Sequence, residues 1–153
     1  MGLFKKKQNL ASEKLMQLGI GLDSIKHEDY SPEEITLDDE LAGKIKISYS
    51  PSVNFWKFDT ILLTDYKDGK RILLFAKNNS VERDIKDLAN ELYKIFGNDW
   101  LERKELELYE LNIYRNSNED FSTIRYWKNF DDYTVELNGS VKTSQITFVL
   151  RGK

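Results

Sequence analysis

The chain has no cysteine, and its 153 residues include one histidine and two prolines. Without cysteine, disulfides, thiolate metal sites and thiol catalysis are all excluded. The single histidine, His27, cannot complete the common zinc or copper sites, which need further imidazole or thiolate ligands. We interpret His27 as a solvated loop residue, and we expect no metal ion, no cofactor and no catalytic residue.

Long apolar runs are missing as well. No stretch approaches the roughly 18 apolar residues of a membrane helix. The basic start Lys5-Lys6-Lys7 is followed by polar residues instead of the apolar core of a signal peptide. Small exported domains often rely on disulfides, so the sequence favours a cytoplasmic protein without membrane insertion.

A basic excess is absent too, since the net charge is −3. Nucleic-acid binders usually carry such an excess, because neutralisation of phosphates drives their affinity. Nucleic acid is therefore not a favoured partner. The acidic pairs Asp38-Asp39 and Asp131-Asp132 do not match a calcium-binding loop, and we interpret them as turn residues and helix-end charges.

The length and composition indicate one folded domain covering residues 1–153. Hydrophobic residues make up 40% of the chain and charged residues 32%, which is typical of a globular protein. Both prolines lie in the first third, so we divide the chain into a less regular part, 1–54, and a regular body, 55–153.

The N-terminal part predicts a short helix over 10–18, from an apolar stripe at i, i+4 and i+7 (Ala11, Leu15, Leu18), capped by Asn9 and ended by Gly19. Ser31, Pro32 and Glu34 form a helix-start signal. We therefore expect a short helix that ends near Gly43, although residues 35–37 alternate like a strand. Residues 44–49 alternate clearly and predict a half-buried strand.

The body opens with a β-hairpin. Residues 55–65 and 71–77 are rich in apolar side chains, and Asp68-Gly69 between them favours a tight turn. Because the apolar runs are continuous, we expect both faces of this hairpin to be covered and the hairpin to lie in the middle of a sheet.

The strongest helix signal covers residues 81–96, between a cap at Ser80 and a stop at Gly97. Its apolar positions recur on one face (Val81, Ile85, Leu88, Ala89, Leu92, Phe96). We expect this face to pack on the sheet, with binding to a partner as the alternative.

The last third predicts more strands. Residues 101–114 are ambiguous, and we prefer a strand with a bulge near Tyr109-Glu110 to a helix. Residues 121–127, 133–137 and 145–151 alternate, and Asn138-Gly139 favours a hairpin turn. The predicted fold class is α+β: a mainly antiparallel sheet of about five to seven strands, one long amphipathic helix on one face, and a short N-terminal helix.

Aromatic residues are the one unusual feature, at 12% of the chain. Large amphipathic rings supply much of the binding energy of protein interfaces. We predict a partner-binding site at Trp56, Arg125, Tyr126 and Trp127. On a strand, Arg125 and Trp127 point to one face and Tyr126 to the other, so one of the two faces should be core.

These observations favour a non-enzymatic protein–protein interaction module of the toxin-neutralising, chaperone-like or regulatory adaptor type, which binds another protein through an aromatic-bearing sheet surface. The alternative is a small-molecule-binding protein or small enzyme with a pocket between the sheet and the long helix. The sequence carries no signal for an oligomeric state.

Overall fold

The computed structural model describes residues 7–22, 33–39, 43–50, 58, 60–66, 69–77, 79, 81–112, 122–139 and 144–150; for 33–39, 43–50, 60–62, 122 and 144–150 it describes the backbone only. The elements in chain order are α1 (Ala11–Leu15), the 3-10 turn η1 (Met16–Leu18), β1 (Glu33–Asp39), β2 (Gly43–Ser50), β3 (Thr60–Asp65), β4 (Arg71–Lys77), α2 (Glu82–Phe96), the 3-10 turn η4 (Leu108–Glu110), β5 (Ser122–Trp127), β6 (Tyr133–Gly139) and β7 (Ser144–Leu150).

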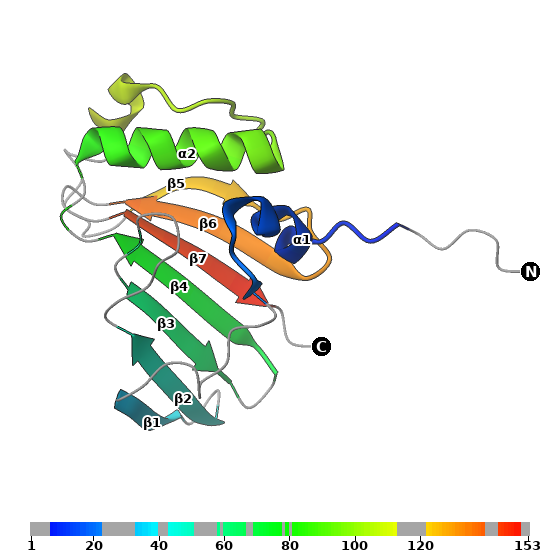
Figure 1. Ribbon diagram of the computed structural model, residues 1–153, viewed down its shortest axis with the longest axis vertical. Helices are drawn as coiled ribbons and strands as arrows, with labels where there is room; N and C mark the ends of the chain where they lie inside the picture. Colours follow the sequence, from blue (N-terminus) through cyan, green and yellow to red (C-terminus); the bar gives the residue numbers. More distant parts are fainter. Residues whose placement is uncertain are drawn as a thin grey trace, which may run out of the picture.

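The described strands form one seven-stranded sheet in the order β1-β2-β3-β4-β7-β6-β5 (Figure 1). Every neighbouring pair in it is antiparallel. After β4 the chain crosses through α2 to the far edge and returns by β5, β6 and β7, so β7 closes against β4. The predicted α+β class, the antiparallel pairing, the long helix and the short N-terminal helix are confirmed.

The β3–β4 hairpin lies near the middle of the sheet, as predicted. Its loop is closed by a hydrogen bond from the Tyr66 N–H to the Lys70 carbonyl (2.8 Å). On one face Leu63 and Leu73 are fully buried, whereas on the other Ile72 and Leu74 are only half-buried. The second face is therefore less fully covered than expected, although Thr64 and Ala76 on it are buried.

Helix α2 lies over β5 and β6 and buries Ile85, Leu88, Ala89 and Leu92 of the predicted apolar stripe (Figure 1). Ile95 is buried as well, whereas the predicted Phe96 is half-buried. It ends at Gly97, whose φ of 78° needs glycine. The predicted start is wrong by one residue: Val81, not Ser80, holds the cap position, and its side chain is exposed instead of joining the stripe. The Asp84 carboxylate accepts the Val81 N–H there (2.9 Å).

The short helix predicted to end near Gly43 is wrong, because residues 33–39 form the edge strand β1. Pairing with β2, from Glu33 opposite Tyr49 to Asp39 opposite Gly43, gives the backbone its hydrogen-bond partners. The alternation of residues 35–37 was therefore the better signal. The capping residues Ser31 and Pro32 lie outside the described residues.

The strand predicted over 101–114 is also wrong. Residues 101–107 are irregular, η4 follows, and Leu111 and Asn112 continue in helical conformation; residues 113 and 114 lie outside the described part. The bulge lies elsewhere, at Ile124 in β5, where the pairing with β6 shifts by one residue.

The turn predicted at Asn138-Gly139 is wrong too, since both residues pair with β7 inside β6. Gly139 serves close packing instead. A Cβ atom there would lie 2.6 Å from Ile124 Cδ1 and 3.4 Å from Ile85 Cδ1. The missing side chain thus lets β5 and α2 approach β6.

Helix α1 is held by the turn between β5 and β6. Asp132 accepts hydrogen bonds from the N–H groups of Ala11 (2.7 Å) and Ser12 (3.0 Å) and from the Ser12 hydroxyl. The predicted cap Asn9 instead binds Asp131: its N–H donates to the Asp131 carboxylate, and its carbonyl accepts the Asp131 N–H. The helix-end interpretation of Asp132 is confirmed.

These contacts change the acidity of Asp132. Burial alone would raise the pKa of its carboxyl, but the hydrogen bonds from Ser12, Ala11 and Tyr133 together lower the pKa below its ordinary value of 3.8. A helix of five residues is too short to persist alone, so α1 depends on this cap and on burial of Ala11 and Leu15.

We predict that Asp132→Asn lowers the free energy of unfolding at neutral pH by about 1 kcal/mol, because the anionic helix cap is lost. In the natural chain this contribution is complete above the ordinary pKa and disappears as the pH falls through the lower folded-state pKa. Denaturant titrations from pH 7 to pH 2 should therefore show a shallower acid dependence in the variant. Asp87→Asn, an exposed charge loss on α2, is the control, and equal slopes in all three proteins would contradict the prediction.

We predict that Gly139→Ala destabilises the fold by about 1 kcal/mol, because the new methyl group displaces the flexible end of Ile124. Ile124→Val removes the colliding Cδ1 atom and costs roughly 1 kcal/mol by itself. The double variant should lose less stability in chemical denaturation than the two single losses added together. Strict additivity would show that this contact does not limit the approach of β5.

Candidate functional site

The structure places the predicted partner-binding residues on both faces of the sheet. Arg125 and Trp127 are buried, with 2% and 3% of their surfaces exposed, whereas Tyr126 on the opposite face is half-buried. The predicted alternation along β5 is confirmed. Trp56 lies outside the described residues. The side chains of Arg125 and Trp127 are therefore directed toward neighbouring segments of the same chain.

Arg125 binds the segment formed by residues 98–112, which we name the edge segment. Its guanidinium contacts both carboxylate oxygens of Glu110 (3.1 and 3.2 Å) and donates to the backbone carbonyls of Lys104 and Glu105 (3.4 Å each). Nη1 also donates to the Ile124 carbonyl (3.0 Å). A buried guanidinium needs such partners, since an unpaired charge in the interior is costly.

Asp99 organises the beginning of the edge segment. Its buried carboxylate accepts two hydrogen bonds from the Arg103 side chain (2.6 and 2.9 Å) and the N–H groups of Leu101 (3.1 Å) and Arg103 (2.9 Å). Burial alone would raise the pKa of Asp99, but the Arg103 guanidinium and the backbone N–H groups of Arg103 and Tyr126 lower it below its ordinary value. The carboxylate is therefore a fixed anion around which the loop turns.

The edge segment closes the free side of β5. The Trp100 N–H donates to the Tyr126 carbonyl (2.8 Å), and the Tyr126 N–H reaches Asp99 Oδ2 (3.4 Å). Further along, the Leu106 N–H donates to Asn90 Oδ1 of α2 (2.9 Å) as the segment runs back beside that helix (Figure 1). Side chains, and not a strand ladder, satisfy this backbone, which is why the segment is irregular.

Exposed apolar side chains gather on the edge segment. Six large apolar side chains are exposed in the described part of the chain, and four of them belong to residues 98–112 (Trp100 45%, Leu101 53%, Leu108 47%, Tyr109 71%). The strand predicted over 101–114 did not indicate an exposed apolar group, because every second side chain of a half-buried strand would lie in the core. The Asp99–Arg103 spacing after the Gly97 stop was the available signal for a loop.

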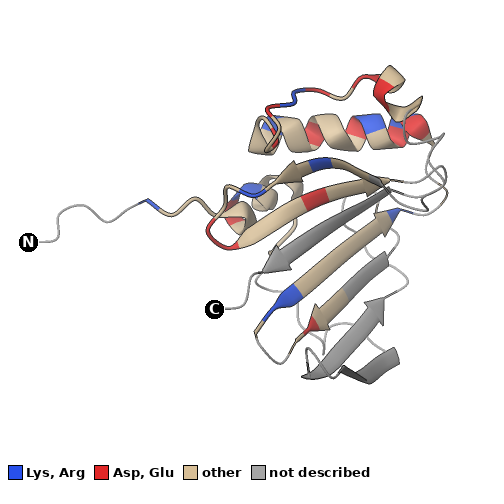
Figure 2. Cartoon of the chain, turned by 180° about the vertical axis from the view of Figure 1, so that it is seen from behind, with Lys and Arg blue, Asp and Glu red and all other residues tan. Residues whose placement is uncertain are grey.

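Charged residues surround these apolar groups. Figure 2 shows acidic and basic residues along α2 and the edge segment, with few on the described strands. On the edge segment Glu102, Glu105 and Glu107 are exposed against one exposed cation, Lys104, because Arg103 is paired with Asp99. The surface around the exposed apolar residues is therefore mildly acidic.

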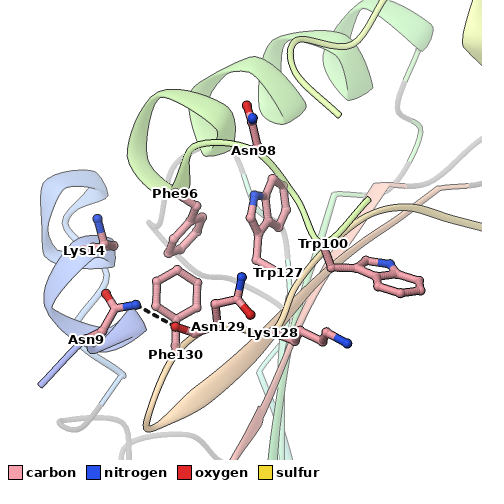
Figure 3. Close-up of a pocket in the computed structure, with 9 residues that line it drawn as sticks. All are labelled: Asn9, Lys14, Phe96, Asn98, Trp100, Trp127, Lys128, Asn129 and Phe130. Carbon is pink, nitrogen blue, oxygen red and sulfur yellow. Dashed lines mark hydrogen bonds between the residues drawn. The ribbon is translucent and has the colours of Figure 1, made fainter. Parts of the chain in front are cut away.

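A pocket of about 140 Å³ opens beside the start of the edge segment, at the C-terminal end of α2 (Figure 3). Residues from α1, α2 and the β5–β6 turn line it (Asn9, Lys14, Phe96, Asn98, Trp100, Trp127, Lys128, Asn129, Phe130). Phe96 contacts Trp127 and Phe130, with ring centroids 5.5 and 5.1 Å apart. The Trp127 indole N–H donates to the Gly97 carbonyl (3.0 Å), which fixes the ring against the helix end.

The described ranges contain neither a metal-binding cluster nor a membrane-spanning helix. No three His, Cys, Asp or Glu side chains there lie close enough together to hold a metal ion. No helix among these residues is long and apolar enough to cross a membrane. The candidate site therefore consists of the edge segment and the adjoining pocket.

We predict that Arg125→Lys lowers the free energy of unfolding by about 2 kcal/mol, because a single ammonium cannot bind Glu110 and the carbonyls together. Hydrogen exchange of the Leu106 amide should become faster as the edge segment loosens. Arg83→Lys, an exposed exchange on α2, should leave both quantities unchanged. A stable Arg125→Lys variant with unchanged exchange would refute the anchoring role.

Comparison of this chain with protein-family models, with curated proteins and with solved structures found no match. A function must therefore be argued from its own side chains. These offer exposed apolar groups on a segment fixed by buried ion pairs, and a small aromatic pocket next to them.

Proposed function

We propose that this protein is a non-enzymatic protein-binding module whose contact surface is the edge segment. The observation that carries the proposal is the concentration of exposed large apolar side chains on that segment. Scattered single apolar residues are normal on a protein surface, but a group of them on one segment is typical of an interaction site.

The way the segment is held supports the same proposal. Both of its ends are fixed by buried ion pairs, Asp99 with Arg103 and Glu110 with Arg125. Buried Leu106 and Leu111 tie it to the core between those ends. A surface fixed before binding loses little conformational entropy when a partner docks, so its apolar groups contribute more to affinity.

The predicted residues Arg125, Tyr126 and Trp127 enter this proposal as positioning residues. Arg125 holds the second half of the segment, and Tyr126 contacts the Trp100 ring edge-on at 6.3 Å. Their effect on a partner would pass through the segment that they orient. The sequence hypothesis placed the binding surface on strand β5 of the sheet. Our proposal places it on the edge segment, which lies beside β5.

The alternative hypothesis placed a small-molecule pocket between the sheet and α2. Apolar side chains occupy that interface in the described residues, with Ile85 close to Gly139 and Leu88 and Leu92 fully buried. The pocket seen among the described residues lies instead beyond the end of α2. Protein binding through the edge segment is therefore the function we favour.

We predict that a tagged form of the protein captures a stoichiometric protein partner from the native cell lysate, and that Leu101→Ala with Tyr109→Ala weakens this capture at least about tenfold. Truncating two exposed anchors typically removes 1 kcal/mol or more from each contact. Binding of the identified partner to purified variants would be measured by calorimetry.

The matched control is Met16→Ala with Val81→Ala, which removes two equally exposed apolar side chains elsewhere on the surface. It should bind the partner like the natural chain. Repeated captures that recover no stoichiometric protein, or a partner that binds both double variants equally, would refute the proposal. Circular dichroism of each variant confirms that folding is retained.

A further inference from the structure

The pocket at the end of α2 has the size of one small ring. Its volume is about 140 Å³, and an apolar cavity on the order of 150 Å³ is large enough to hold benzene. On one side of it Phe96 packs against the rings of Trp127 and Phe130 (Figure 3). Aromatic walls of this kind bind a flat or compact apolar group by close contact and desolvation.

The rim of the pocket supplies hydrogen-bond donors and positive charge. Three asparagines and two lysines stand among its nine lining residues, and no aspartate or glutamate does. Lys14 uses its ammonium for one long hydrogen bond, to the Ile95 carbonyl (3.4 Å). Lys128 lies over the Trp100 ring, 4.7 Å from its centroid. Within the described residues neither ammonium is paired with a carboxylate.

The carboxylates nearest in sequence already have partners. Asp99 is paired with Arg103, and Asp132 caps α1. Two of the neighbouring acids bind lining residues: Asp131 accepts the Asn9 N–H (2.9 Å), and Glu102 accepts a hydrogen bond from the Asn98 amide (3.2 Å). The whole chain has a net charge of −3, whereas the residues that line the pocket include two lysines and no acid. The charge of the lining residues is therefore positive.

We propose that this pocket binds a carboxylate carried by a single ring or an apolar group of similar size. The apolar part lies against Phe96 and Phe130, and the carboxylate meets Lys14 and the asparagine side chains at the rim. A carboxylate is an acceptor of several hydrogen bonds, which matches ammonium and amide donors. The two proposals can fail separately, because Leu101 and Tyr109 do not line the pocket, although Trp100 belongs to both surfaces.

The test is a titration of the full chain with benzoate, followed by two-dimensional NMR of its N–H groups. Benzoate should shift the Trp127 indole N–H and the backbone amides of Asn129 and Phe130 in a saturable way. Benzamide, which has the same shape without the charge, should bind about two- to fivefold more weakly, since an exposed ion pair contributes up to about 1 kcal/mol.

Substitutions of lysine test whether the charge at the rim contributes to benzoate binding. Lys14→Gln should weaken benzoate binding about two- to fivefold, whereas Lys94→Gln, an exposed lysine of α2 outside the pocket, should not change it. The Leu101→Ala, Tyr109→Ala protein should bind benzoate normally even when protein docking is lost. Absence of saturable shifts, equal binding of benzoate and benzamide, or a Lys14→Gln protein that binds like the natural one would overturn the proposal.

A second pair of ligands identifies the source of the carboxylate. N-acetylphenylalanine carries its carboxylate as the end of a protein chain does, next to a peptide N–H. Tighter binding of this compound than of benzoate would assign the pocket to the C-terminus of a partner protein, and the reverse order would assign it to a free small acid. Either order upholds a carboxylate site.

Discussion

A positive charge inside the protein must be neutralised where it lies, and Arg125 sets this constraint for the whole candidate site. Apart from the Ile124 carbonyl of its own strand, its partners are Glu110 and the carbonyls of Lys104 and Glu105, which come from the edge segment. The segment cannot leave the sheet without stranding a charge in the interior, which would cost several kcal/mol. The irregular course of residues 98–112 is therefore as firmly determined as a strand, although no ladder of backbone hydrogen bonds holds it.

The sequence predicted the regular parts of this fold well because their signals are periodic. The α2 stripe and the β5, β6 and β7 alternations each repeat over several residues, so single exceptions such as Val81 shift an end without changing the element. The wrong predictions concern residue types that are compatible with more than one local structure. Gly139 permits a turn but also a close approach of α2, and the glutamates and leucines of 101–114 suit a helix, a strand or a covered loop. Which use applies depends on Arg125 and Asn90, whose contacts with this segment are distant in sequence.

The sequence located the region of the candidate site but did not show which of its side chains are exposed, because that too depends on contacts distant in sequence. The aromatic and basic residues at 125–128 marked the right region, yet burial separates Arg125 and Trp127 from the surface, whereas Tyr126 contacts the exposed Trp100 ring. Trp100 belongs to both proposed sites, since it is one of the exposed apolar groups and also a wall of the pocket. An acidic apolar surface and a basic aromatic pocket thus adjoin at one residue. A single ligand that carried both a basic apolar patch and a carboxylate could engage the two together.

The cap on α1 has a consequence for the order of folding. The donors on Ala11 and Ser12 and the acceptor on Asp132 are separated by 121 and 120 residues, which is most of the chain. Contacts of such separation close late, because the intervening chain must first be ordered. Residues 9–12 leave the ribosome long before the β5–β6 turn exists, so they must wait without their partner. Residues 9–12 are therefore synthesised early but fixed late. Leu15, Ile20 and Leu22 are buried only after these residues are fixed. Until β6 has formed, these apolar side chains are exposed to chaperones or to premature association.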